Sequence, residues 1–123
     1  MLGYEEKAYK TCVFMLTEEI PEPKAREVCE AIIYEAKQRY FDLKSARDSQ
    51  IAKELAQRIY LKYGDSLSNK LDQEKLTGVI LKMANTKTNY EILKEGLNLI
   101  GTGVSLVSLI KMAYKFTAIA AIA

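Results

Sequence analysis

The chain has 123 residues, of which 49% are apolar and 28% charged, and its formal net charge is +2. These values are typical of one globular domain, and they argue against a disordered chain and against a dedicated nucleic-acid-binding domain. Only two prolines and six glycines occur, while leucine, alanine, lysine and glutamate recur at helical spacing, so we predict an all-α fold.

Residues 1–20 and 22–63 are predicted to form an N-terminal helical hairpin, with Pro21 and Pro23 at its turn. The first arm carries an apolar stripe at spacings of three and four residues: Tyr9, Cys12, Val13, Leu16 and Ile20. Two alternatives fit the second arm. It either runs unbroken to about Tyr63, or it breaks near Ser45, where Ser45–Asp48 would cap a new helix.

Short helices are predicted over residues 71–100 and an apolar terminal helix over 101–123. Gly64 is expected to end the hairpin in a left-handed conformation. The first short helix should turn four apolar side chains inward: Leu76, Val79, Ile80 and Met83. Thr88 and Glu91 match a capping box. We therefore expect a single-domain helical bundle over residues 1–123, with five to six helices and a highly apolar C-terminal helix.

The most apolar part of the chain is Leu97–Ala123, which holds no acid and only two charges, Lys111 and Lys115. Its apolar side exceeds half of the helix circumference, so the bundle, other subunits or lipid must cover it. The uncharged run Gly96–Ile110 is shorter than the roughly 18 to 20 residues that span a bilayer. The candidate assembly or lipid contacts are Val104, Val107, Ile110, Phe116, Ile119 and Ile122.

Cys12 and Cys29 are predicted to lie nearly level in the hairpin, because they are nine residues before and eight residues after Pro21. Both fall on the predicted inward stripes. Two interpretations stay open. They are buried free thiols, or they form a disulfide that staples the hairpin and indicates an oxidising compartment or a hyperthermophile cytosol.

The chain has no histidine, so it lacks the usual general base and the commonest zinc ligand. The glutamates near the first turn (Glu18, Glu19, Glu22, Glu27 and Glu30) are predicted to form a solvated face. We therefore expect no enzyme activity, catalytic residue, metal, cofactor or small-molecule substrate.

Charge is unevenly distributed, with an excess of acids over residues 1–35 and of bases over residues 36–62. The candidate nucleic-acid or headgroup contacts are Lys37, Arg39, Lys44 and Arg47 in the basic middle, with Lys111 and Lys115 in the terminal helix. The acidic N-terminus does not match a secretory signal, which leaves a virion-associated, cytoplasmic or membrane-peripheral location.

Our hypothesis from sequence is a non-enzymatic structural or interaction protein: an assembling subunit of the virion or filament coat type. Its C-terminal helix would contact other subunits or lipid, with itself or another protein as partner. The alternative is a small cytoplasmic helical binding protein, such as an immunity protein or inhibitor, that covers a basic partner with its acidic N-terminal hairpin. The abundance of lysine, glutamate, isoleucine and tyrosine is also typical of a thermophile.

Overall fold

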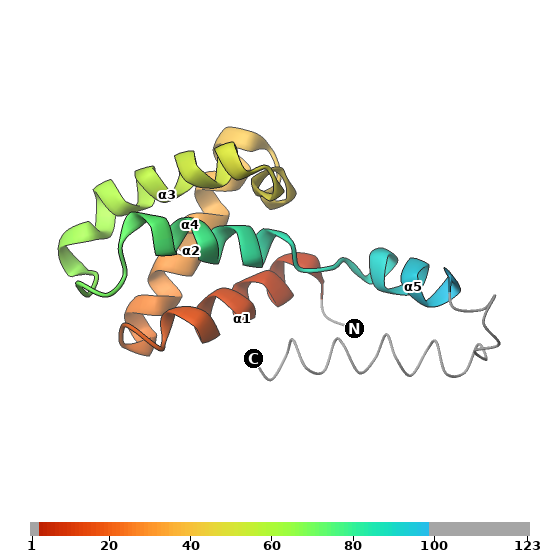
Figure 1. The fold of residues 1–123 in the computed structure, drawn as a ribbon, viewed down its shortest axis with the longest axis horizontal. Coiled ribbons are helices and arrows are strands. Elements are labelled where there is room, and N and C mark those ends of the chain that lie inside the picture. Colours follow the sequence, from red (N-terminus) through yellow and green to blue (C-terminus); the bar gives the residue numbers. More distant parts are fainter. Residues whose placement is uncertain (1–2, 99–123) are drawn as a thin grey trace.

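The computed structural model describes residues 3–98, and this part of the chain is all-helical. Its helices are α1 (Tyr4–Leu16), α2 (Glu22–Tyr40), α3 (Ser49–Tyr63), α4 (Gln73–Ala84) and α5 (Asn89–Asn98), with short 3₁₀ helices η1 (Leu43–Arg47) and η2 (Gly64–Ser66). Helices α1 and α3 each pack against both α2 and α4, whereas α5 lies beyond one end of this four-helix bundle (Figure 1). The all-α prediction is confirmed; the predicted helix over 101–123 lies outside the described residues.

The predicted second arm over residues 22–63 is divided, because α2 ends at Tyr40 and η1 separates it from α3. Asp48 opens α3: its carboxylate accepts hydrogen bonds from the backbone N–H groups of Gln50 (2.9 Å) and Ile51 (3.2 Å). The Ser45 hydroxyl donates to the Tyr40 carbonyl at 2.9 Å and so binds η1 to the end of α2. The chain therefore follows the broken alternative, with Asp48 as the cap.

Helix α2 ends in a strained turn at Phe41, which has φ 73° and is the only non-glycine residue with positive φ among residues 3–98. Bulky residues rarely adopt this conformation, and it costs on the order of 1–3 kcal/mol. The Phe41 side chain is 92% exposed, so contacts within the chain do little to offset that cost.

The prediction of a left-handed Gly64 was wrong, because Gly64 has φ −52°. Helix α3 tightens there into η2 instead of reversing through a left-handed residue. Leu67 donates its backbone N–H to the Gly64 carbonyl at 3.2 Å, which closes this last turn.

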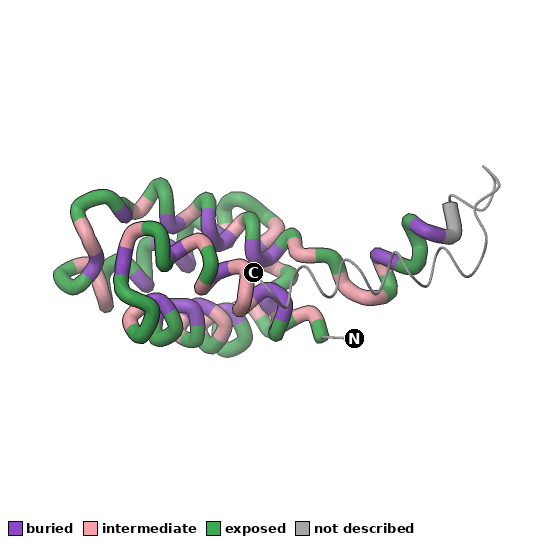
Figure 2. Tube along the Cα trace, turned by 90° about the horizontal axis from the view of Figure 1, so that it is seen from below, coloured by how far each residue is buried: buried purple, intermediate pink, exposed green. Residues whose placement is uncertain are grey.

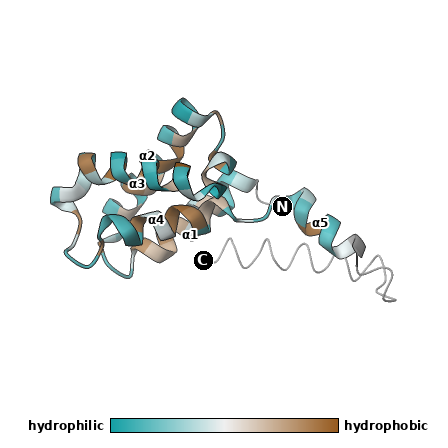
Figure 3. Cartoon of the chain, turned by 45° about the horizontal axis from the view of Figure 1, so that its top comes forward, coloured by the Kyte–Doolittle hydropathy of each residue, from teal (hydrophilic) through white to brown (hydrophobic). Residues whose placement is uncertain are grey.

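One core lies between the four bundle helices, and buried positions recur along the inner side of each helix (Figure 2). Hydrophobic and hydrophilic residues alternate along the ribbon at helical spacing (Figure 3). The four inward residues predicted for α4 (Leu76, Val79, Ile80 and Met83) are all in this core. The apolar face predicted for α4 therefore packs into the core of the bundle.

Cys12 of α1 and Cys29 of α2 form a disulfide within the core. Their Cα atoms are 5.9 Å apart, and both residues are fully buried. Two antiparallel helices joined at Pro21 bring these positions level. The bond closes a loop with a sequence separation of 17, and cross-linking a loop of this size stabilises a fold by roughly 3 kcal/mol.

We expect reduction of the disulfide to need denaturant, because both cysteines are fully buried. Mass spectrometry should show a gain of two hydrogens after reduction. Urea denaturation should show a free energy of unfolding roughly 3 kcal/mol lower for the reduced chain than for the oxidised chain. The same reductant should not change the stability of a Cys12→Ala/Cys29→Ala variant. An unchanged mass after reduction in denaturant would contradict the cross-link.

Candidate functional site: a helix tethered at the end of the bundle

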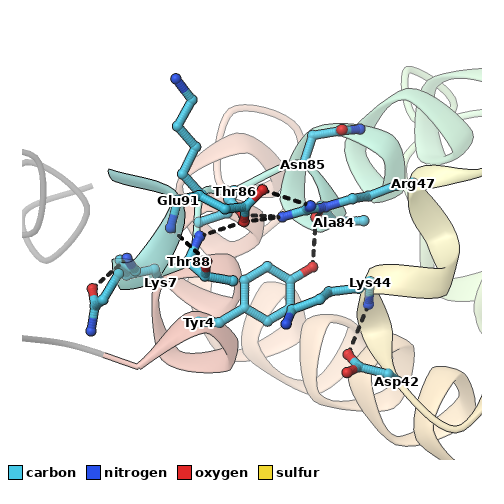
Figure 4. Close-up of polar contacts among 12 residues, drawn as sticks. Tyr4, Lys7, Asp42, Lys44, Arg47, Ala84, Asn85, Thr86, Thr88 and Glu91 are labelled. Carbon is cyan, nitrogen blue, oxygen red and sulfur yellow. Dashed lines mark hydrogen bonds and ion pairs between the residues drawn. The ribbon is translucent and has the colours of Figure 1, made fainter. Parts of the chain in front are cut away.

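Arg47 occupies the centre of a polar junction where η1, the end of α4 and the start of α5 meet (Figure 4). Its Nε donates to the Ala84 carbonyl at 2.8 Å, and its Nη2 donates to the Thr86 carbonyl at 2.9 Å. Nη1 and Nη2 also donate to the two carboxylate oxygens of Glu91 at 2.9 and 2.8 Å. One guanidinium therefore satisfies carbonyls at the end of α4 and holds the first turn of α5.

Thr88 and Glu91 form the capping box that the sequence predicts. The backbone N–H of Thr88 donates to Glu91 Oε1 at 2.8 Å, and the backbone N–H of Glu91 donates to Thr88 Oγ1 at 3.1 Å. The hydrogen bond from Arg47, followed by that from the Thr88 backbone, lowers the pKa of the Glu91 carboxyl to about 2. Glu91 therefore stays ionised far below neutral pH.

Tyr4 joins the start of α1 to the same junction. Its hydroxyl donates to the Ala84 carbonyl at 2.5 Å. The Lys44 ammonium and the Arg47 guanidinium carbon lie 5.4 and 5.6 Å from the centre of its ring. Burial raises the pKa of the Tyr4 hydroxyl to about 12, so it remains a hydrogen-bond donor at neutral pH.

Lys7 provides a second link between α1 and α5. Its side chain is the only buried charged one among residues 3–98, and its Nζ donates to Oδ1 of Asn89 at 2.9 Å. Desolvation lowers the pKa of the Lys7 ammonium, and the nearby charge of Glu91 opposes that shift. A buried charge is costly without a polar partner, so this contact fixes the first residue of α5 beside α1.

Beyond these tethers, α5 projects from the bundle in both views of the chain (Figures 1 and 2). Tyr90 is 71% exposed and Leu93 is 41% exposed, whereas Ile92 is buried. An ion pair between Lys87 and Glu95 spans its first turns. The junction thus presents a helix with exposed apolar side chains outside the bundle.

The predicted site residues do not form a single cluster within the described part of the chain. The predicted assembly contacts (Val104, Val107, Ile110, Phe116, Ile119 and Ile122) and Lys111 and Lys115 lie outside the described residues. In the basic middle, Lys37 pairs with Glu5 at 3.3 Å and Arg39 with Glu35 at 2.9 Å. Lys44 and Arg47 meet on the Tyr4 ring, and Arg47 is also bonded to Glu91.

Lys7 and the Arg47–Glu91 pair are the elements of this site that sequence reasoning missed. Arg47 and Glu91 are 44 positions apart, and Lys7 and Asn89 are 82 apart, so no local spacing relates either pair. The one available signal was Lys7 itself, one position before Ala8 and five before Cys12, at the edge of the apolar stripe of α1.

Neither a metal site nor a membrane-spanning helix is found in the described part of the chain. Residues 3–98 contain no group of three His, Cys, Asp or Glu side chains placed to hold a metal ion. Within the same range, no helix has both the length and the apolar character needed to cross a membrane. Comparisons with protein-family models, curated proteins and solved structures found no match. The function is therefore inferred from the geometry of this chain.

We expect the docking of α5 to weaken as the pH falls from 4.5 towards 2. Folding lowers the pKa of Glu91 from its ordinary 4.5 to about 2, so the stabilisation is present above pH 4.5 and is lost as the carboxylate is protonated. Hydrogen exchange of the α5 amides across this range measures the effect. Glu91→Gln should weaken protection at neutral pH and remove this pH dependence. Full α5 protection at pH 2 would contradict the role of the ion pair.

Replacing Arg47 by methionine should lower the free energy of unfolding by about 2 kcal/mol, because charge-assisted hydrogen bonds in a partly buried site are lost. The matched control is Arg39→Met, which removes an exposed i,i+4 pair with Glu35 and should change stability by at most about 0.5 kcal/mol. Urea denaturation of both variants measures the difference. Equal losses would show that Arg47 contributes no more than a surface charge.

Proposed function

We propose that this chain is a non-enzymatic structural subunit that assembles through α5 and the apolar segment 101–123, as in a virion or filament coat. One observation carries the proposal. Lys7 and Arg47 hold the first turn of α5 at the end of the bundle, while Tyr90 and Leu93 remain exposed. Exposed apolar groups on a positioned element are typical of an interaction surface.

The tethering of α5 supports this role energetically. A helix as short as Asn89–Asn98 is marginal by itself in water, so its order depends on its contacts. The contacts from Lys7 and Arg47 are polar and lie at its first turn, where they set the direction of the helix. A surface that is already ordered loses less entropy when it binds, which favours association.

The sequence that follows α5 supports the same conclusion. Between Gly101 and Ala123 the only charged residues are Lys111 and Lys115, and there is no acid. As a helix, this segment would have so broad an apolar side that neighbouring subunits or lipid would have to cover it. The two lysines would then face nucleic acid, lipid headgroups or water, since buried lysines need a partner.

The disulfide supports a subunit that works where thiols are oxidised. Cys12 and Cys29 are the only cysteines of the chain, and their bond lies inside the core. Such a bond fits an extracellular particle, or the cytosol of a hyperthermophile, better than a reducing cytosol. The same bond would hold the bundle together while its outer surfaces bind neighbours.

We expect the 123-residue chain to form species larger than a dimer with rising concentration, and a chain that ends at Gly101 to stay folded without forming these larger species. Light scattering across a concentration series, with circular dichroism to check folding, measures this. If the full chain is monomeric and the shortened chain unfolds, the terminal segment belongs to the core. That outcome would reject assembly and favour the alternative, a small helical inhibitor that covers a basic partner with its acidic N-terminal hairpin.

Point variants test whether association depends on α5 or on exposed apolar side chains in general. Tyr90→Ser/Leu93→Ser should weaken association of the full chain and leave the bundle folded, because both side chains are exposed. Leu61→Ser is the matched control, since Leu61 is 80% exposed on α3, and it should not change association. If Leu61→Ser weakens association as strongly, α5 has no special part in it.

A further inference from the structure

The side of α2 that faces away from the bundle carries a row of exposed side chains. We call it the α2 outer stripe: Glu27, Glu30, Tyr34, Lys37 and Phe41, all of them exposed. The first four follow one another at spacings of three and four residues, which places them along one side of α2, and Phe41 comes directly after the end of the helix. Tyr34 is 62% exposed and Phe41 is 92% exposed, so two large aromatic side chains lie on this face.

The stripe is accompanied by shallow hollows along α2. A hollow of about 260 Å³ lies between α2 and the end of α3 and is lined by Glu27, Ala31 and Tyr63 among others. Glu30 and Tyr34 line both this hollow and the next, and Lys37 lines the next and a third beside Phe41. The first hollow is larger than a phenyl ring, and the strained, exposed Phe41 at the other end of the stripe supplies such a ring.

The charges along the α2 outer stripe would be complementary between two antiparallel copies of the chain. Glu27 and Glu30 precede Tyr34, and Lys37 follows it. Glu30 takes part in none of the ion pairs found within residues 3–98, and the Lys37–Glu5 pair is about half exposed. A second α2 that runs antiparallel, with the two-fold axis at Tyr34, would therefore set opposite charges against each other.

The distances along the helix agree with this arrangement. Glu27 lies seven residues before Tyr34 and Phe41 seven residues after it, which is about 10 Å in each direction at 1.5 Å per residue. Rotation about an axis at Tyr34 therefore brings Phe41 of one copy to the Glu27 end of the other. That end holds the 260 Å³ hollow.

We propose that the α2 outer stripe is a two-fold interface between two copies of this chain. Phe41 of each copy fits the partner's hollow beside Tyr63, Glu30 pairs with the partner's Lys37, and the two Tyr34 rings meet at the axis. This surface goes beyond the α5 surface and does not depend on it. A subunit with both would join dimers into larger arrays.

Cross-linking of the full chain tests the axis directly. Tyr34→Cys places a free thiol on the axis, since Cys12 and Cys29 are paired with each other. Mild oxidation should give a cross-linked dimer, whereas Leu61→Cys, exposed on α3, should give at least tenfold less. Association through α5 alone would give no preference for cross-linking at position 34 over position 61. Equal cross-linking of the two variants would therefore overturn the α2 interface and leave the proposed function untouched.

Charge reversal in the Tyr34→Cys background tests the ion pairs. In the proposed dimer, position 30 faces the partner's Lys37. Adding Glu30→Lys therefore sets two positive charges against each other and should reduce the cross-linked dimer at least tenfold. Adding Lys37→Glu as well restores opposite charges and should recover most of the dimer. Failure of Glu30→Lys to reduce the dimer, or of the double reversal to recover it, would overturn the pairing.

Phe41→Gly separates an interface role from a structural one. Glycine accepts positive φ without strain, so the thermal stability of the chain should not fall, while cross-linking through Tyr34→Cys should fall at least tenfold. Lower thermal stability together with undiminished cross-linking would assign the Phe41 ring to the fold of its own chain and overturn its role in the interface.

Discussion

The placement of α5 on the bundle depends most on the hydrogen bonds that the Arg47 guanidinium donates. This guanidinium bonds the Ala84 carbonyl at the end of α4, the Thr86 carbonyl in the linker and both carboxylate oxygens of Glu91 in α5. Helix ends leave carbonyl groups without partners, and a planar fork of donors can satisfy several at once. Because these acceptors lie on both sides of the α4–α5 linker, the direction of α5 follows from the position of η1.

Two kinds of contact stabilise the two parts of the described chain. The bundle is stabilised by apolar packing and by the Cys12–Cys29 disulfide, neither of which depends on ionised side chains. Helix α5 is held by charged and polar contacts from Lys7 and Arg47. Such contacts have strict geometry, so they orient a helix more than they cover it. This division suits the proposed subunit, in which the scaffold would stay fixed while α5 and the α2 outer stripe bind neighbours.

Much of the fold was readable from local sequence patterns. The apolar stripes of α1 and α4, the proline turn at Pro21 and the capping box of Thr88 and Glu91 all appear where they were predicted, because each depends on residues within one or two helical turns. A break in the second arm, predicted near Ser45, was only one of two alternatives, since no proline or glycine marks it, and the structure ends α2 at Tyr40. The assignment of a left-handed residue to Gly64 was wrong, because α3 continues there into η2, and the positive φ lies instead at Phe41, a residue type that does not predict it.

The sequence by itself determined the all-α character of residues 3–98, the inner faces of α1 and α4 and the level placement of the two cysteines, because helical periodicity and turn chemistry are local. Only the tertiary structure decided that Arg47 bonds Glu91, that Lys7 is buried against Asn89 and that Tyr4 reaches Ala84. These partners are 44 to 82 positions apart. Their pairing depends on how the four helices cross in space, and the spacing of residues along a single helix carries no record of that crossing.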